Sequence, residues 1–244
     1  MGKASLKIPY HIEYGGFKDS VWGVHVSKRP SIPAPREIIQ TYQIPGRDGA
    51  LTIKDGTYED VRIPVEFSFS AYPDTWQEVV AGLKIWLLER GSGAELRMTD
   101  LPDYFYKVRY VEMSEVEREY RKVGTFTAEF VCEGCQYYDS GKTEQVVLGS
   151  LTNPGIISHP KYLIAGTGSC TLTVNGKSLQ ATVSSNMTID TDKAMAYRTS
   201  SVMQNTALIM GDYGFADFWL QPGNNSISIS SGFTLRIIPN WRRL

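Results

Sequence analysis

The chain has 244 residues, of which 42% are hydrophobic and 21% are charged, and its 25 lysines and arginines nearly balance its 26 aspartates and glutamates. The hydrophobic fraction is sufficient for a packed core, whereas the net charge of −1 lacks the basic excess that accompanies wholesale nucleic-acid binding. No stretch approaches the roughly 20 apolar residues that span a bilayer, and no secretory signal follows Met1. We therefore expect a soluble chain that recognises neither nucleic acid nor a membrane.

The composition changes near residue 140. Residues 1–140 contain 17 Lys and Arg and 21 Asp and Glu, whereas residues 141–244 contain 8 and 5 and are rich in Ser, Thr, Asn and Gly. The length alone is compatible with one large β domain or with two ordinary domains. Because the second stretch suits short strands joined by tight turns, we predict two domains, 1–140 and 141–244.

One helix is predicted in the first domain. Asp74 can cap it, and Gln77 completes a D-x-x-Q variant of the capping box. Gly91 is expected to close it in the left-handed conformation. The apolar face of this helix repeats at helical spacing and consists of Trp76, Val79, Val80, Leu83, Trp86 and Leu87.

The rest of the first domain alternates with the period of a strand. Residues 61–69 and 125–132 place apolar side chains at every second position, and residues 104–113 form a further candidate strand after a turn at residues 101–103. Pro64 cannot donate a ladder hydrogen bond, so we expect its strand to lie at a sheet edge or to carry a bulge. The first domain is thus predicted to be a β-sheet structure with one helix.

The second domain shows strands and turns only. Asn175-Gly176 follows an alternating segment and is the strongest short signal for a hairpin. Pro222-Gly223 separates two further candidate strands, and residues 234–238 form a last one before Pro239. Several short strands at close spacing predict a β-sandwich of about 100 residues.

A search for catalytic motifs finds none. The three histidines, His11, His25 and His159, have no metal-site spacing, and neither a nucleophile elbow nor a phosphate loop is present. Cys132 and Cys135 form a C-x-x-C that ends a strand, without the helix of a redox site or the second pair of a zinc site. We expect reduced structural thiols, no metal, no cofactor and no enzyme activity.

A cluster of glutamates is the strongest exception to this expectation. It consists of Glu112, Glu115, Glu117 and Glu119, and a glycosidase carboxylate pair could lie within it. Three basic residues, Arg118, Arg121 and Lys122, are interleaved with the cluster. Because charge-mixed surface segments are mostly solvated, a solvated face or a subunit contact is favoured.

Three stretches together resemble one protein family. The first is residues 42–51 and 55–69, which include Pro45-Gly46-Arg47-Asp48-Gly49. The second is the helix end at residues 86–87 and residues 96–106, which include Leu101-Pro102-Asp103. The third is residues 220–227, which include Gln221-Pro222-Gly223-Asn224-Asn225, and the closing residues 238–244. No single motif is specific, but their order along essentially the whole chain resembles the distal tail proteins of long-tailed bacteriophages (siphophages).

The resemblance implies a mainly β fold and a structural function. It implies an N-terminal domain related to tail-tube subunits, which closes a homo-hexameric ring or two stacked rings, and a C-terminal galectin-like sandwich that decorates the ring. The implied partners are the tail-tube protein and the tail-tip protein, with a receptor-binding protein or a host polysaccharide at the outer domain. The implied location is the tail tip of the virion, after assembly in the bacterial cytoplasm.

The alternative hypothesis is a carbohydrate-binding module whose C-terminal sandwich recognises sugars of the host surface. Aromatic side chains that could contact a sugar or a partner are Tyr197, Tyr213, Phe215 and Trp219, next to Phe218, and some of them are expected in the core. In the first domain, the proline-rich residues 30–35 cannot form regular structure. They are predicted to be either an extended arm that reaches a neighbouring subunit or an ordinary surface loop.

Overall fold

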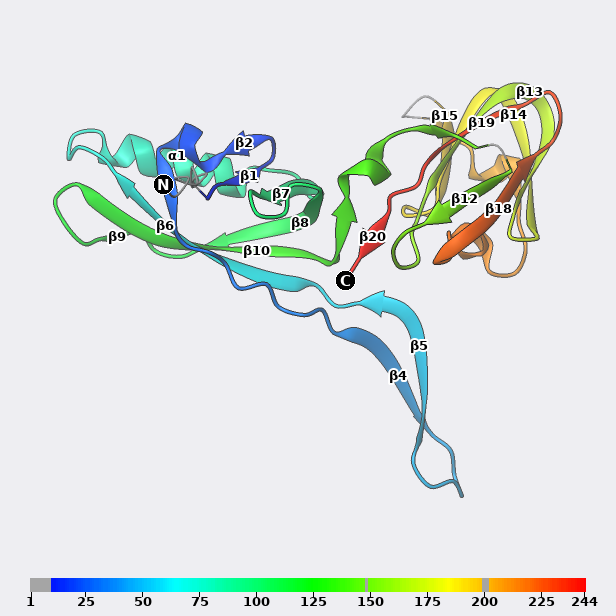
Figure 1. The fold of residues 1–244 in the computed structure, drawn as a ribbon, viewed down its shortest axis with the longest axis horizontal. Coiled ribbons are helices and arrows are strands. Elements are labelled where there is room, and N and C mark those ends of the chain that lie inside the picture. The colour runs from blue at the N-terminus through cyan, green and yellow to red at the C-terminus, as the bar shows by residue number, and fades with distance from the viewer. Residues whose placement is uncertain (1–9, 148, 199–201) are drawn as a thin grey trace, which may run out of the picture. The chain divides into compact units, whose positions relative to one another are not determined.

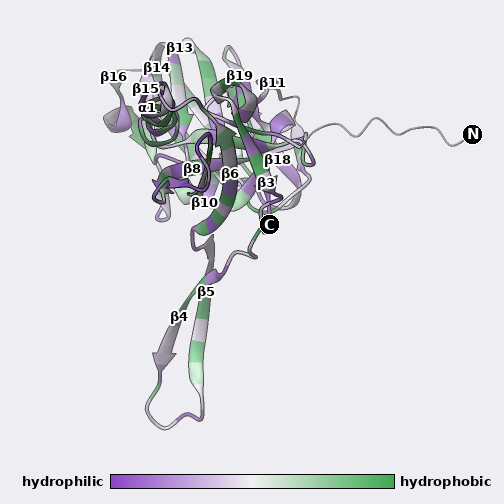
Figure 2. Ribbon diagram, turned by 90° about the vertical axis from the view of Figure 1, so that its left-hand side faces the viewer, coloured by the Kyte–Doolittle hydropathy of each residue, from purple (hydrophilic) through white to green (hydrophobic). Residues whose placement is uncertain are grey.

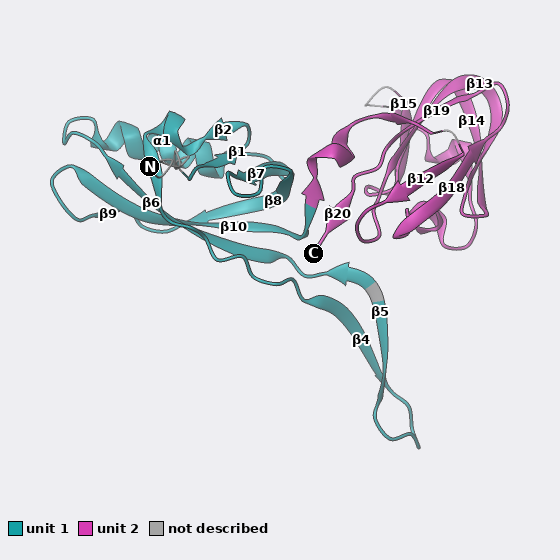
Figure 3. Ribbon diagram, viewed as in Figure 1, with its two compact units in different colours: residues 1–136, 244 teal, residues 137–243 magenta. Residues whose placement is uncertain are grey.

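The computed structural model describes residues 10–147, 149–198 and 202–244. Within these limits the chain forms two compact units, unit 1 from residues 1–136 with Leu244, and unit 2 from residues 137–243 (Figure 3). Strands dominate both units, and one α-helix is present among the described residues. The predicted mainly β fold with one helix is therefore confirmed, while the independence of the two domains stays a prediction.

Unit 1 is built on one antiparallel sheet whose strands differ in length. The strand order is β2-β1-β7-β8-β10-β6-β3, and β9 also pairs with β10. A separate two-stranded sheet joins β4 and β5. The elements are β1 Ile12–Tyr14, β2 Phe17–Lys18, a 3-10 helix Asp19–Trp22, β3 Val24–Lys28, β4 Glu37–Gln43, β5 Ala50–Tyr58, β6 Val61–Ser70, α1 Trp76–Leu88, β7 Ala94–Met98, β8 Tyr104–Met113, β9 Glu117–Arg118 and β10 Val123–Tyr138.

The core of unit 1 lies between the sheet and α1. Along β6 the burial alternates strictly, because every second side chain of a strand faces the same side. β10 runs antiparallel to it, with Phe126 opposite Phe67. Trp86 of α1 is fully buried, stacks on Trp22 at 6.0 Å and donates its indole N–H to the carbonyl of Tyr14 at 3.2 Å. Burial of the helix face thus confirms the predicted core stripe.

The ends of α1 differ from the prediction. Thr75, not Asp74, occupies the N-cap, and no side-chain hydrogen bond caps the helix there. The helix ends at Leu88 with Glu89 as the C-cap residue in a right-handed conformation. The left-handed glycine is Gly93, with φ +90°, rather than Gly91. The capping box was therefore wrong, and packing of the apolar face stabilises the helix instead.

Pro64 shows how a proline can lie within a strand that is not the sheet edge. β6 has β10 on one side along its length, and Pro64 lies opposite Glu129. On the other side β3 pairs with β6 from Glu66 to Phe69, with a register shift between Val26 and Lys28. The predicted edge position is wrong for the strand as a whole, but Pro64 falls beyond the residues paired with β3, where a missing N–H is tolerated.

A two-stranded hairpin, here called the arm, extends from unit 1. β4 and β5 pair with each other from Glu37 opposite Tyr58 to Gln43 opposite Ala50 (Figure 1). Gly46 and Gly49 at its tip have φ values of +79° and +77°, which the turn requires. A two-stranded hairpin is only marginally stable in water when it is isolated.

Unit 2 contains a sheet with the strand order β11-β19-β13-β14-β15-β16, to which β17 is joined through β14 and β18 through β13, and β12 pairs with β18. Its elements are a 3-10 helix Asp139–Lys142, β11 Gln145–Val146, β12 Ser150–Asn153, β13 Lys161–Val174, β14 Lys177–Asp190, β15 Met195–Arg198, β16 Val202–Met203, a 3-10 helix Asn205–Ala207, β17 Leu208–Ile209, a 3-10 helix Gly214–Phe218, β18 Gly223–Ile229, β19 Thr234–Ile238 and β20 Arg242–Arg243.

The hairpin β13–β14 forms the centre of unit 2. Asn175 and Gly176 at its turn have φ values of +47° and +81°, as the predicted hairpin requires. β13 pairs with β19 over its first residues and with β18 over its last. The change of partner falls between Ala165 and Leu172. Gly166, directly after the residues paired with β19, has a φ of +150°, and a Cβ there would lie 2.3 Å from the Phe233 ring. The two long strands contribute Tyr162, Leu172 and Ile189 to the core of unit 2.

Candidate functional surfaces

Most of the exposed apolar residues of the arm lie on one face, while Ile39, opposite Lys54, lies on the other. Tyr42 lies opposite Leu51 and Gln40 lies opposite Ile53, so these four side chains share a face, as do residues two positions along each strand. The phenol of Tyr42 donates to the amide oxygen of Gln40 at 2.6 Å, in agreement with this register. Ile38 continues the same face, and all the apolar members are exposed; Figure 2 shows apolar residues spaced along β5. This apolar face is uncovered within the described residues.

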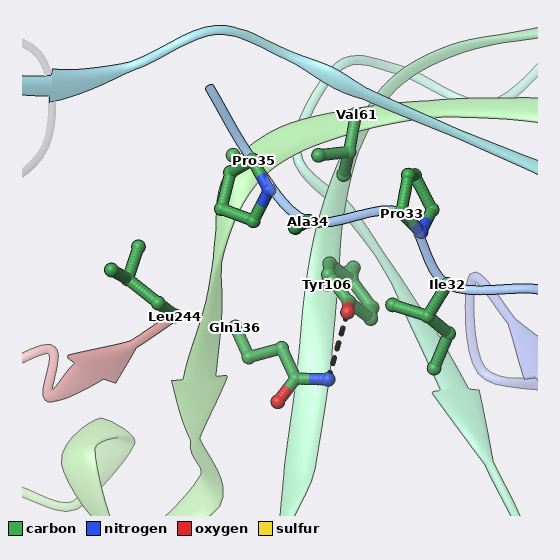
Figure 4. Close-up of a pocket in the computed structure, with 9 residues that line it drawn as sticks. Ile32, Pro33, Ala34, Pro35, Val61, Tyr106, Gln136 and Leu244 are labelled. Carbon is green, nitrogen blue, oxygen red and sulfur yellow. Dashed lines mark hydrogen bonds between the residues drawn. The ribbon is translucent and has the colours of Figure 1, made fainter. Parts of the chain in front are cut away.

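A hollow of about 390 Å³ lies at the base of the arm in unit 1 (Figure 4). Its walls are Ile32, Pro33, Ala34, Pro35, Val61, Tyr106, Gly134, Gln136 and Leu244. The buried amide of Gln136 donates to the phenol oxygen of Tyr106 at 2.8 Å. The proline-rich residues 30–35 are irregular, as expected. Residues 32–35 line this hollow, and the arm is the hairpin that follows them.

The glutamate cluster is divided between two environments. An open hollow of about 420 Å³ is lined by Glu115, Glu117 and Glu119. Its other walls are Glu66, four residues with hydroxyl groups (Ser27, Ser114, Thr125 and Thr127) and two phenylalanines (Phe67 and Phe126). Glu112 instead accepts a hydrogen bond from Arg62 at 3.4 Å, and the same guanidinium contacts Glu129 at 2.9 Å. All these carboxylates are partly or fully accessible. The arrangement favours a solvated or partner-facing surface over a pair of catalytic carboxylates held in a closed site.

A hollow of about 580 Å³, here called the sheet-face hollow, lies on unit 2. Its walls come from β13, β14 and β19 and from the segment before β11: Glu144, Leu163, Ile164, Ala165, Asn186, Met187, Thr188, Thr234 and Arg236. Ile164 and Met187 face the core, and the other members belong to the outer face. Glu144 and Arg236 form an ion pair with an Nη1–Oε1 distance of 2.9 Å.

The strand register extends this outer face across the sheet. Consecutive pairs of opposite residues link six strands into one row: Val146, Arg236, Leu163, Thr188, Tyr197 and Met203. Because opposite residues of paired strands point to the same side, Tyr197 lies beside the hollow and next to Thr188. Sequence reasoning identified Tyr197 but missed Glu144, Leu163 and Arg236, which belong to distant segments.

The other three predicted aromatic residues have different surroundings. Tyr213 is 75% exposed at the start of the 3-10 helix Gly214–Phe218, whereas Phe215 packs against the core of unit 2. Trp219 stacks on the ring of His159, with 4.3 Å between ring centroids. No ring contact joins any two of these four aromatic side chains in the parts of the chain that the structure describes. They therefore do not make one aromatic platform, and their binding roles remain proposals.

His159 forms a polar cluster that the sequence did not indicate. Its Nδ1 lies 3.1 Å from Asp192, its Nε2 lies 3.0 Å from the guanidinium of Arg242, and its backbone carbonyl accepts a hydrogen bond from Asn240 at 2.8 Å. Three other segments of unit 2, those of Asp192, Arg242 and Trp219, therefore meet at one imidazole. The cluster fixes the segment before β20 in place, which explains the stacking of Trp219 as a structural contact.

The cysteines are buried and reduced. Burial raises the pKa of Cys132 to about 12, and the carboxylates of Asp60 and Glu133 add to this effect. Among the described residues, no group of three or more His, Cys, Asp or Glu side chains could hold a metal ion. No helix in the described ranges is long and apolar enough to cross a membrane.

Neither a protein-family model nor a curated protein sequence matches the chain. The fold is mainly β and is divided into two compact units. The chain is similar to the crystal structure of the SPP1 Dit (gp 19.1) protein, a paradigm of the hub adsorption apparatus in phages that infect Gram-positive bacteria. The TM-score is 0.61 at 14% sequence identity, over 96% of this chain and 98% of that chain. The likeness establishes a Dit-like fold along nearly the whole length.

Proposed function

We propose that this chain is a distal tail protein, a structural hub subunit at the tail tip of a long-tailed phage. The observation that carries the proposal is the Dit-like fold, which includes both units and leaves little of either chain unmatched. Fold alone does not fix function, but the ordered sequence stretches that resemble distal tail proteins fall in the same chain. The proposed activity is binding between tail proteins, without catalysis, cofactor or metal.

The proposed assembly is a homo-hexameric ring or two stacked hexamers. A ring needs a head-to-tail interface in which different surfaces of the same chain meet. The arm supplies a surface of this kind, since it extends from unit 1 and exposes one apolar face. Burial of that face against a second copy would stabilise both the arm and the ring. The proposed neighbours of the ring are the tail-tube protein and the tail-tip protein, within the virion.

Labelling of intact virions tests this proposal. Antibodies against the purified chain are bound to particles of a phage that encodes it, and the label is located by electron microscopy. The proposal predicts label at the distal end of the tail and co-purification of the chain with the tail-tube and tail-tip proteins. Label on the capsid or along the tail shaft, or absence of the chain from virions, would contradict it.

A second proposed function is recognition of a host polysaccharide by unit 2. We propose that this unit is a galectin-like sandwich. The observation that favours it is the sheet-face hollow, whose volume of about 580 Å³ lies in the range typical of ligand sites. This function is compatible with the hub role because it uses a different unit from the arm. A receptor-binding protein is the other partner proposed for unit 2.

A further inference from the structure

We propose that the sheet-face hollow binds a neutral oligosaccharide and that Tyr197 forms one end of the site. This inference deepens the second proposed function and does not depend on the hub role. The site comprises the apolar floor, the polar groups around it and the adjacent ring, all on the outer face of the β19–β13–β14–β15 sheet.

The floor and the rim of the hollow match the two kinds of surface on a sugar ring. Leu163 and Ala165 lie two residues apart on the same face of β13 and give an apolar floor for the C–H face of a pyranose. Thr188 and Thr234 place hydroxyl groups on the strands at either side, and Asn186 adds an amide. Hydroxyl and amide groups can both donate and accept hydrogen bonds, as sugar hydroxyls do. Ligand sites commonly combine an apolar lining with a few polar groups that fix orientation.

The charges at the hollow favour a neutral ligand. Arg236 is paired with Glu144 at 2.9 Å, and Lys161, two residues before Leu163 on the same face, is paired with Asp190 at 3.1 Å. Arg236 and Lys161 therefore each have an anion beside them. Arg198, the last residue of β15, donates to the hydroxyl of Ser184 on β14 at 2.8 Å and does not line the hollow. A compensated ion pair keeps its outward hydrogen-bonding groups but attracts a polyanion weakly.

Tyr197 is the aromatic residue that the register places beside the hollow. It lies opposite Thr188 and is half-buried, so part of its side chain is accessible on the same face as the hollow. A tyrosine offers an apolar ring face and a polar hydroxyl, which suits the C–H and O–H groups of a sugar. Phe215 and Trp219 are engaged by the core and by His159, and Tyr213 lies on a different element.

The test uses the full chain and isothermal titration calorimetry. The probes are neutral hexasaccharides of glucose, galactose and N-acetylglucosamine, with poly(glycerol phosphate) as an anionic comparison. We expect at least one neutral probe to bind, with an affinity that changes less than twofold over a tenfold change in salt, because screening acts on charges. Tyr197→Ala should weaken this binding by about five- to tenfold, the loss expected for an aromatic contact of about 1 kcal/mol.

The matched control is Tyr213→Ala, which removes an exposed tyrosine from another element of unit 2. It should leave sugar binding unchanged, and Arg236→Ala provides a second variant within the hollow that should weaken it. Binding of no neutral probe at millimolar concentration, or binding of poly(glycerol phosphate) alone, would overturn the inference. Loss through Tyr213→Ala but not through Tyr197→Ala would also overturn it. Ring assembly of each variant is measured separately, so that failure of the hub proposal is distinguishable.

Discussion

The apolar face of the arm gives the sharpest prediction about assembly. Ile38, Tyr42, Leu51 and Ile53 expose 41%, 49%, 37% and 43% of their surface. Full burial of such a side chain contributes about 1.5–3 kcal/mol, so covering the remaining two fifths is worth roughly 0.6–1.2 kcal/mol for each residue. Four residues together therefore contribute about 2.5–5 kcal/mol to each subunit interface.

Replacing Ile53 by Asp should remove one of these contributions and place a carboxylate in the interface. Burying an unpaired charge costs several kcal/mol even after relaxation, so we expect a total loss of about 4 kcal/mol per interface. A loss of this size weakens association by roughly a thousandfold. The stability of the isolated subunit should hardly change, because Ile53 is exposed and lies on the arm, away from the core of unit 1.

The assay is sedimentation velocity over a wide range of concentration, with Thr52→Asp as the matched control. Thr52 is the neighbour of Ile53 on β5, is also exposed, and points to the opposite face of the hairpin. The wild type and Thr52→Asp should form the large assembly, whereas Ile53→Asp should remain monomeric. Equal assembly of the two variants would refute the assignment of the apolar face as the interface.

Three further predictions concern unit independence, packing and thiol chemistry. Residues 137–243, expressed alone, should unfold in one cooperative transition because they contain their own core; a chain without such a transition would count against two domains. Gly134→Ala should lower the melting temperature by about 3–10 °C, since the added Cβ would lie 2.4 Å from the carbonyl oxygen of Glu59 and overpacking costs about 1–3 kcal/mol. The control is Gly91→Ala, whose added Cβ meets open space; equal melting temperatures of the two variants would refute this. At pH 8 the Cys132 thiol should react with a disulfide reagent only after denaturation. The thiolate is the reactive form, and it is hardly populated at pH 8 in the folded chain because the pKa of Cys132 is raised to about 12. Rapid labelling of Cys132 in the folded chain would contradict this prediction.

Local patterns in the sequence predicted the regular parts of the fold. Period-two alternation identified β6 and much of β10, because one face of each strand is buried against α1. Asn175-Gly176 identified the central hairpin of unit 2, because its two positive φ angles suit these residues. The capping box at Asp74 failed because the helix begins two residues later and is held by Trp86 and its neighbours.

The candidate surfaces depended on information that is absent from local patterns. The arm contains alternating apolar residues, but a hairpin that lies outside the core gives no burial signal of its own. Arg236 and Thr188 lie on either side of Leu163, which is paired with both of them. Only the strand register reveals that these residues share a face with Tyr197. Likewise, Trp219 could not be assigned to a face until His159 was found against its ring.

The measurement that tests the proposed hub role most directly is the oligomeric mass of the purified full chain at high concentration, with electron-microscope images of the same sample. The account predicts six or twelve copies arranged as closed rings with sixfold symmetry, because the head-to-tail interface must close. A stable dimer or trimer that persists as the concentration rises would contradict it.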